Sequence, residues 1–249
     1  MTQIEGSQPR ARYSQNLVEA GYAALLAGRP KTAIIDFEQA LKWQKSNSDA
    51  NYFLARAFID LADGAMFRHW ASTSNMGAYN SWGDGSAMRV SAVPYFAADE
   101  AQLFELTARQ TAITHNHPDA IVGAQAVALA TWMAMLGAAA DSIRQEITDR
   151  FGYDLTPSVD DIRPHHTFDV SCAGTTPTAI ICALAAADYE DAIRNAISLG
   201  GDSDTLACIA GGIAEAIFGV PEKIAATAWG YLTDELDAVV KRFLTHIDL

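Results

Sequence analysis

Small and apolar residues recur at helical spacing along most of the chain, whereas the strict alternation of a half-buried strand is hard to find. Near the N-terminus three such faces predict three short helices, and Gly28-Arg29-Pro30 breaks the chain between the first two. The faces consist of Leu17, Gly21, Ala24 and Leu25, then Ala33, Phe37, Ala40 and Leu41, then Leu54, Ala55, Phe58 and Leu61. The pattern predicts an all-α protein.

The same periodicity predicts further helices after a change of texture near Asp63-Gly64. We expect them at roughly 87–96, 99–114, 118–136, 140–150, 176–186, 188–198, 204–218, 221–231 and 233–247. Residues 71–86 interleave turn formers with aromatics, which is typical of an ordered functional loop. Residues 157–175 are expected to form a long irregular connection.

The N-terminal helices resemble a tetratricopeptide repeat. The matching residues are Leu17, Gly21, Ala33, Phe37 and Ala40, and the repeat period of about 34 residues carries Gly21 onto Ala55 and Ala24 onto Phe58. Two or three ordinary amphipathic helices would give much the same pattern. Because one and a half repeats cannot bury their own apolar faces, we expect these helices to pack against the rest of the chain or a protein partner.

Charge narrows the range of partners. Half of the 249 residues are hydrophobic, enough for a sizeable core, and the formal net charge is −13. Such a balance repels phosphate backbones and anionic lipids, so it disfavours roles with nucleic acid or at a membrane surface. The same excess of acidic residues suits a protein that gathers carboxylates around a hard cation.

The cysteines and the N-terminal residues indicate the cellular compartment in which the protein is expected. Cys172, Cys182 and Cys208 match no zinc-binding spacing, and an odd number of scattered thiols fits a reducing environment. The chain begins without a basic region followed by an apolar run, and no segment has the length and character of a membrane span. A cytoplasmic protein without a membrane partner is the prediction.

Three loops carry polar residues that helix packing does not require, and the first precedes the helix expected at 204–218. In Gly200-Gly201-Asp202-Ser203-Asp204-Thr205 two carboxylates and a hydroxyl can turn toward one point. Oxygen ligands of this kind suit Mg²⁺, Mn²⁺ or Ca²⁺ rather than zinc. Acidic residues at this place also serve as ordinary helix caps, which is the simpler interpretation.

The second loop runs from Asn80 to Arg89. Its glycines allow a close approach of backbone to a ligand at the start of a helix, and Arg89 is placed to reach a diphosphate. The alternative is a tight turn with a capped helix and an arginine in an ion pair. As candidate substrate-binding residues we take Ser81, Gly83, Asp84, Gly85, Ser86, Met88 and Arg89.

The third loop is Thr114-His115-Asn116-His117-Pro118. Histidines two positions apart do not share a helix face, and Pro118 opens the next helix, so His115, Asn116 and His117 form a turn that can line a cleft. One capping and one solvent-facing histidine is the alternative. Cys172 has no activating partner nearby in sequence, which argues against a thiol nucleophile.

Together and in this order, these segments resemble the bacterial ADP-ribosylglycohydrolase family. The stretches that carry the resemblance are Met66–Trp70, Tyr79–Val90, Thr114–Pro118 and Gly200–Thr205 with its small-residue helix. The resemblance implies an orthogonal bundle of helices around a cleft with two Mg²⁺ ions, and hydrolysis of the glycosidic bond of an ADP-ribose conjugate. It further implies that Asp202, Asp204 and Thr205 are metal ligands, and that the 81–89 loop and the 115–117 turn bind the ADP-ribose moiety.

The chain departs from the family pattern at its beginning. Family members open with a Gly-Asp pair and a Thr-Asp-Asp motif that supply the other half of the metal site, and neither occurs before residue 64. A smaller departure is Asp84, where many relatives carry asparagine. We therefore divide the chain into a tetratricopeptide-like segment, 1–63, and an incomplete glycohydrolase-like domain, 64–249, that retains one Mg²⁺ or none.

Three hypotheses follow for function. In the first, the chain is a hydrolase that recruits metal ligands from Asp60, Asp63 or another subunit. In the second, it is a catalytically impaired relative that binds ADP-ribose, or that binds a protein through its N-terminal helices. In the third, it is a fusion or truncation product of little function. No catalytic residue is assigned, because the family's N-terminal acids are absent. The intact 200–205 segment favours the hydrolase, and the absent Thr-Asp-Asp motif favours the other two.

Overall fold

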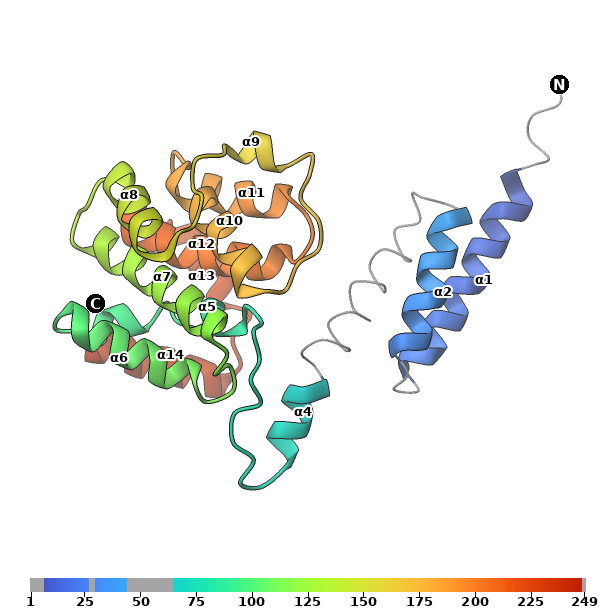
Figure 1. Cartoon of the computed structure of the whole chain (residues 1–249), viewed down its shortest axis with the longest axis horizontal. Coiled ribbons are helices and arrows are strands. Elements are labelled where there is room, and N and C mark those ends of the chain that lie inside the picture. The colour runs from blue at the N-terminus through green and yellow to red at the C-terminus, as the bar shows by residue number, and fades with distance from the viewer. Residues whose placement is uncertain (1–6, 27–29, 44–64, 248–249) are drawn as a thin grey trace. The chain divides into compact units, whose positions relative to one another are not determined.

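The computed structural model describes residues 7–26, 30–43 and 65–247, and within these residues every regular element is a helix. The all-α prediction is confirmed (Figure 1). None of the helices in this part of the chain is long and apolar enough to cross a lipid bilayer. The chain divides into two compact units, residues 1–77 and 78–249.

The first unit contains a helical hairpin formed by α1 (Ser7–Leu26) and α2 (Pro30–Trp43), followed by α4 (Ala65–Ser72). The hairpin has its own small core of Val18, Ala24, Ala33, Phe37 and Ala40. Gly21 lies against Phe37, and a Cβ at Gly21 would lie only 2.5 Å from Phe37 Cε1, so the two predicted faces do meet. The third predicted face, residues 54–61, lies outside the described residues. The tetratricopeptide assignment and the division at residue 63 remain predictions.

The second unit is a bundle whose centre is formed by three helices, α7 (Pro118–Met135), α10 (Cys172–Leu184) and α12 (Ser203–Phe218). Around them lie α6 (Glu100–Thr111), α8 (Ala140–Phe151), α11 (Tyr189–Ser198), α13 (Glu222–Trp229) and α14 (Asp234–His246), with three short helical turns. These turns are α5 (Gly85–Met88), the 3₁₀ helix η2 (Val93–Phe96) and α9 (Val159–Ile162).

Small residues explain why the central helices approach closely. α7 buries six alanines and Gly123, and α10 and α12 also carry small residues where they meet their neighbours. A Cβ at Gly123 would lie 2.9 Å from both Cys172 Cβ and Thr176 Oγ1, so only glycine lets α7 and α10 meet at this distance. This packing brings together the beginnings of α5, α7, α10 and α12, where the polar loops lie.

Two helix boundaries differ from the sequence prediction for a physical reason. The helix expected over 87–96 is broken into α5 and η2, because Pro94 cannot donate a backbone hydrogen bond and its ring disfavours a helical residue before it. α10 begins at Cys172 rather than at 176, since the Ser171 side chain caps it by accepting a hydrogen bond from Gly174 N (3.0 Å). The expected irregular connection therefore ends earlier, and it also contains α9.

Replacing Gly123 with valine tests the contact between α7 and α10. We expect a loss of about 2–3 kcal/mol of unfolding free energy, because overpacking forces the two helices apart. Thermal denaturation measures the effect as a lower Tm. Gly77→Val serves as the control, since a Cβ at Gly77 meets nothing within 4 Å. A Gly123→Val Tm equal to that of the unmodified protein would contradict the packing described.

Candidate functional site

The loop before α5 is held by backbone pairing with the segment before α10. Asp84 N donates to Val170 O (2.9 Å) and Cys172 N donates to Trp82 O (3.1 Å), which makes an isolated antiparallel bridge between Gly83 and Ser171. Two exchanged hydrogen bonds fix the relative position of segments that are almost 90 residues apart in sequence. The starts of α5 and α10 are therefore positioned together.

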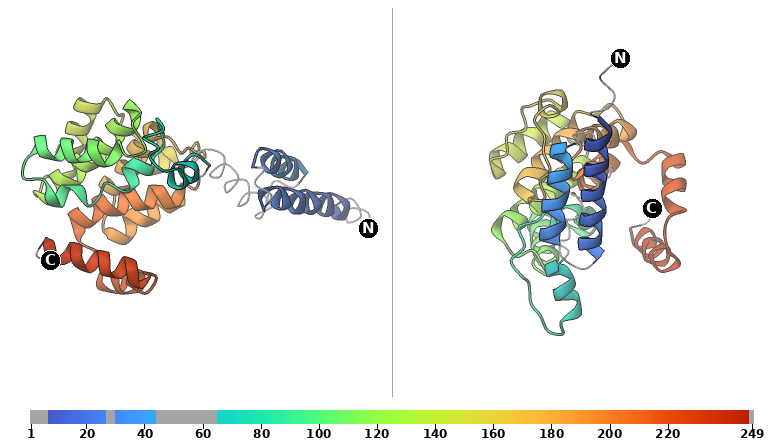
Figure 2. Two further views of the ribbon diagram at one scale, coloured as in Figure 1. Left: turned by 90° about the horizontal axis from the view of Figure 1, so that it is seen from below. Right: turned by 90° about the vertical axis from the view of Figure 1, so that its right-hand side faces the viewer.

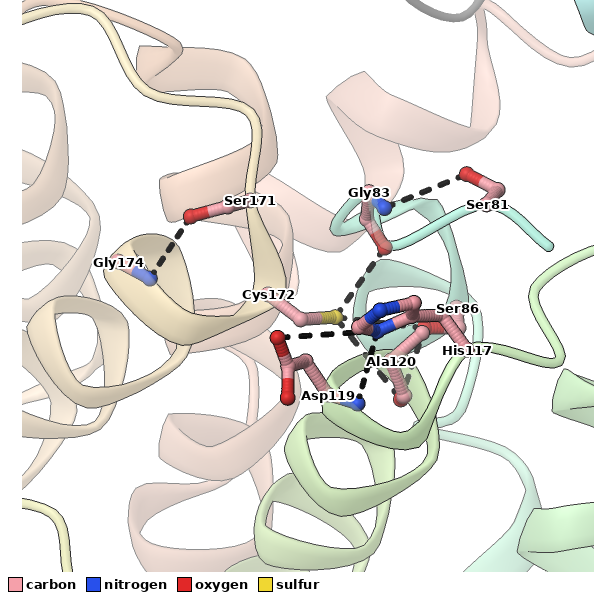
Figure 3. Close-up of polar contacts among 9 residues, drawn as sticks. All are labelled: Ser81, Gly83, Ser86, His117, Asp119, Ala120, Ser171, Cys172 and Gly174. Carbon is pink, nitrogen blue, oxygen red and sulfur yellow. Dashed lines mark hydrogen bonds and ion pairs between the residues drawn. The ribbon is translucent and has the colours of Figure 1, made fainter.

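The Cys172 side chain stabilises the contact between the segments before α5 and α10. Its Sγ donates to Gly83 O (3.2 Å) and lies 3.4 Å from Ser86 Oγ, which itself donates to Ala120 O on α7 (3.1 Å) (Figure 3). Burial raises the pKa of the Cys172 thiol to about 11. The side chain is therefore a protonated structural donor at neutral pH, in agreement with the expectation that it is not a nucleophile.

Three carboxyl groups gather where α5 and α12 begin. Asp84 and Asp202 are only 3% and 7% exposed, and Asp202 hydrogen-bonds with both Asp84 and Asp204. Thr175 Oγ1, from the first turn of α10, donates to Asp84 Oδ2 (2.8 Å), and Thr205 hydrogen-bonds with Asp202. We call Asp84, Asp202 and Asp204 the acidic cluster.

The acidic cluster is electrostatically unfavourable without a counter-charge. The pKa of Asp202 is raised to about 6, chiefly by burial and then by the neighbouring Asp204 carboxyl group, while hydrogen bonds with Asp84 and Thr205 act in the opposite direction. Two carboxyl groups can hydrogen-bond to each other only when one of them holds a proton. A bound cation would relieve the same repulsion without that proton.

The predicted metal ligands fit a hard cation by their chemistry. Asp202, Asp204 and Thr205 lie together at the start of α12, and all offer oxygen atoms. In the part of the chain that the structure describes, however, no three acidic, histidine or cysteine side chains already form a group that could hold a metal ion. The donors that are present thus suit a cation, and they do not complete a cage around one.

His115 lies beside α5 and is almost fully buried, with 4% of its surface exposed. Its Nδ1 is 2.7 Å from Thr114 Oγ1, which accepts a hydrogen bond from Arg89 Nη2 (2.9 Å). Burial, and then the charge of Arg89, lower the pKa of His115 to about 4, so the ring is neutral at neutral pH. Its Nε2 is buried and makes no hydrogen bond to the described residues.

The other residues of the 115–117 turn have structural partners. His117 caps α7 by accepting at Nδ1 from Asp119 N (3.2 Å), and Asn116 Oδ1 accepts from Asn80 N (2.7 Å). The capping role matches the simpler interpretation of His117. The Asn116 contact connects the turn to the 80–89 loop, where Asn80 has a left-handed backbone (φ 57°).

The remaining loop residues are also placed by the structure. Ser81 Oγ accepts from Gly83 N (3.2 Å), Met88 is 39% exposed, and Arg89 Nε donates to Gln110 Oε1 (3.1 Å). Gly85 lies close against His115, because a Cβ there would lie 3.0 Å from His115 Nε2. Their contact with a substrate stays a prediction.

Two features of the site were not found from the sequence. Thr175 had no motif to mark it, and its role follows from its contact with Asp84. A cavity of about 300 Å³ is lined by Ile162, His165, His166, Thr167, Asp169, Gly174 and Thr178. It adjoins the 200–205 loop, because a Cβ at Gly201 would lie 3.1 Å from His166 Nε2. This cavity could not be predicted from the sequence, because residues 157–175 show no periodic pattern.

Comparison with known proteins places the chain in a family. A model of the ADP-ribosylglycohydrolase family matches residues 13–248, which include α2 and most of α1. A solved structure described as an ADP-ribosylglycohydrolase-related protein complex shares 20% sequence identity and a TM-score of 0.50, over 98% of this chain and 81% of the other. The search of curated proteins gave no match. The chain belongs to the ADP-ribosylglycohydrolase family, whose members hydrolyse ADP-ribose linkages.

Proposed function

We propose that the chain hydrolyses the glycosidic bond of an ADP-ribosylated protein or of a small ADP-ribose conjugate, with Mg²⁺ bound at the acidic cluster. The observation that carries the proposal is the burial of Asp84 and Asp202 within hydrogen-bonding reach of one another, next to Asp204. A purely structural core has no need for such an arrangement, because buried carboxylates are costly unless a cation or donor offsets them. Family membership supports ADP-ribose linkages as the substrate class.

The cation would be held by Asp202, Asp204 and Thr205, with Asp84 as a further oxygen donor in place of the family's missing N-terminal acids. When bound, a divalent cation orients a ribose diol, polarises a water molecule and offsets charge that develops as the bond breaks. The chain's own contribution is to fix the donors. Thr175 holds Asp84 by its hydrogen bond, and the start of α12 holds the other two carboxylates.

His115 would supply a neutral hydrogen-bond donor to the substrate. Arg89 can only donate, so Thr114 Oγ1 accepts from Arg89 and gives its own proton to His115 Nδ1. The ring proton then resides on Nε2, which is buried beside Gly85 and makes no hydrogen bond to the described residues. An oxygen of the ADP-ribose moiety placed there would accept this N–H.

A second candidate function is binding of ADP-ribose without hydrolysis. The observation that favours it is that the described residues contain no complete metal-holding group, together with the absence of the Thr-Asp-Asp motif from the sequence. In that case the neutral His115 donor and the 80–89 loop would still recognise the ligand, while the water-activating chemistry would be lost. The N-terminal helices would then bind a protein partner that responds to the bound ADP-ribose.

Replacing Asp204 with asparagine tests the hydrolase. Release of ADP-ribose from ADP-ribosylated arginine and serine peptides is followed by liquid chromatography in millimolar Mg²⁺. We expect the unmodified protein to be active and Asp204→Asn to lose at least 100-fold, because the count of ligand charges sets the affinity for a hard cation. Asp149→Asn is the matched control, since Asp149 is exposed and bonds only to Gln145 among the contacts described.

Calorimetry separates the two candidates. If the unmodified protein binds ADP-ribose but takes up no Mg²⁺ and releases no product, the hydrolase proposal fails and the binding function is supported. If it takes up Mg²⁺ and the uptake strengthens with ADP-ribose, the donors present suffice for the cation. If the protein binds neither ADP-ribose nor Mg²⁺, both candidate functions are contradicted.

The protonation of His115 is a separate prediction. In ¹⁵N-edited NMR spectra His115 is expected as the Nε2–H tautomer, neutral down to about pH 4, because burial and Arg89 disfavour the charged ring. Thr114→Val removes the donor to Nδ1 and is expected to weaken ADP-ribose binding about 10-fold, as a lost hydrogen bond of about 1.4 kcal/mol would. A ring that titrates near pH 6.5, or that carries its proton on Nδ1, would contradict the assignment.

A further inference from the structure

α13 and α14 stand at the edge of the second unit, and the two views in Figure 2 show them apart from its central helices. α13 buries none of its residues, and no described side chain of α14 is buried. Among the contacts of α14 is that of Phe243, whose ring centroid lies 5.6 Å from those of Tyr95 and Phe96. Most of the surface of α14 is therefore open.

The contacts of α14 define which face is open. Asp237 accepts from Trp229 Nε1 of α13 (2.6 Å) and pairs with Lys241 (2.8 Å), so this side faces α13. Phe243 faces η2. Between these two sides lie Glu235, Ala238, Val239 and Arg242, which are all exposed and share one helical face because they are spaced by three, four and seven residues.

This open face is apolar in the middle and oppositely charged at its ends. Val239 is 57% exposed, and the small Ala238 beside it permits a close approach of another helix. Glu235 precedes this centre by three to four residues, and Arg242 follows it by the same distance. The apolar surface continues into a groove lined by Phe96, Val239, Lys241, Arg242, Phe243 and Thr245.

We propose that α14 pairs antiparallel with α14 of a second copy of this chain, about a two-fold axis between Ala238 and Val239. In this arrangement Glu235 faces the partner's Arg242, and Arg242 faces the partner's Glu235. The charge pattern singles out a second copy, because a face with an acid at one end and a base at equal distance on the other is complementary to itself only when reversed. Antiparallel helices also align their dipoles favourably.

The dimer covers the side chains that the unit leaves open. Ala238 and Val239 of the two copies would pack across the axis, with Phe96 at either flank (43% exposed). A helix of 13 residues is only about 20 Å long, so the interface is small and the association is expected to be weak, in the micromolar range.

Charge reversal tests the arrangement, with sedimentation velocity of the full chain over about 1–200 μM as the measurement. Glu235→Arg sets two pairs of like charges against each other in each dimer, as does Arg242→Glu, and each variant is expected to weaken dimerisation at least 10-fold. The double variant Glu235→Arg/Arg242→Glu restores both pairs and is expected to return to within about threefold of the unmodified chain.

Glu190→Arg is the matched control, because it makes the same charge change on an exposed residue of α11, away from α14. Circular dichroism confirms that each variant is folded. Dimers that respond to both single variants and recover in the double variant support the proposal. A chain that stays monomeric at 200 μM overturns the proposal. Dimerisation that neither single variant weakens also overturns it, and so does dimerisation that the single variants weaken but the double variant does not restore.

Discussion

The short antiparallel pairing of Trp82–Asp84 with Val170–Cys172 is the constraint on which the site depends. Each partner opens a helix, so the two exchanged hydrogen bonds fix the start of α5 against the start of α10. Cys172 reinforces the junction, because its thiol donates to Gly83 O and lies beside Ser86. Thr175, one turn further along α10, can then reach Asp84. Without this pairing the acidic cluster would lose its first member.

The second constraint is electrostatic. Asp84 and Asp202 are buried and the exposed Asp204 lies beside them, and the pKa of Asp202 is raised to about 6 by its burial and then by Asp204. The fold tolerates this repulsion because small residues pack α7, α10 and α12 tightly and hold the helix starts in place. A cation bound at the acidic cluster, as we propose, would relieve this repulsion.

The helical periodicity was enough to predict the fold class, since apolar faces such as those around Gly21 and Phe37 can be recognised locally. The first and last residues of α5 and α10 were harder to predict from the sequence. They depend on Pro94 and on the Ser171 cap, whose effects are decided by tertiary contacts. The gathering of Asp202 and Asp204 with Thr205 follows from their spacing, whereas the approach of Asp84 from 118 residues away does not. The different environments of His115 and His117 are likewise set by packing, because their sequence surroundings are almost the same.

The most direct measurement is anomalous diffraction from crystals of the full chain grown with Mn²⁺, which substitutes for Mg²⁺ at oxygen ligands. The account predicts an anomalous peak at the acidic cluster, within bonding distance of oxygen atoms of Asp202 and Asp204, and with Asp84 turned toward it. A map without a peak at this cluster, in crystals saturated with Mn²⁺, would contradict the central claim that the three carboxylates form a cation site.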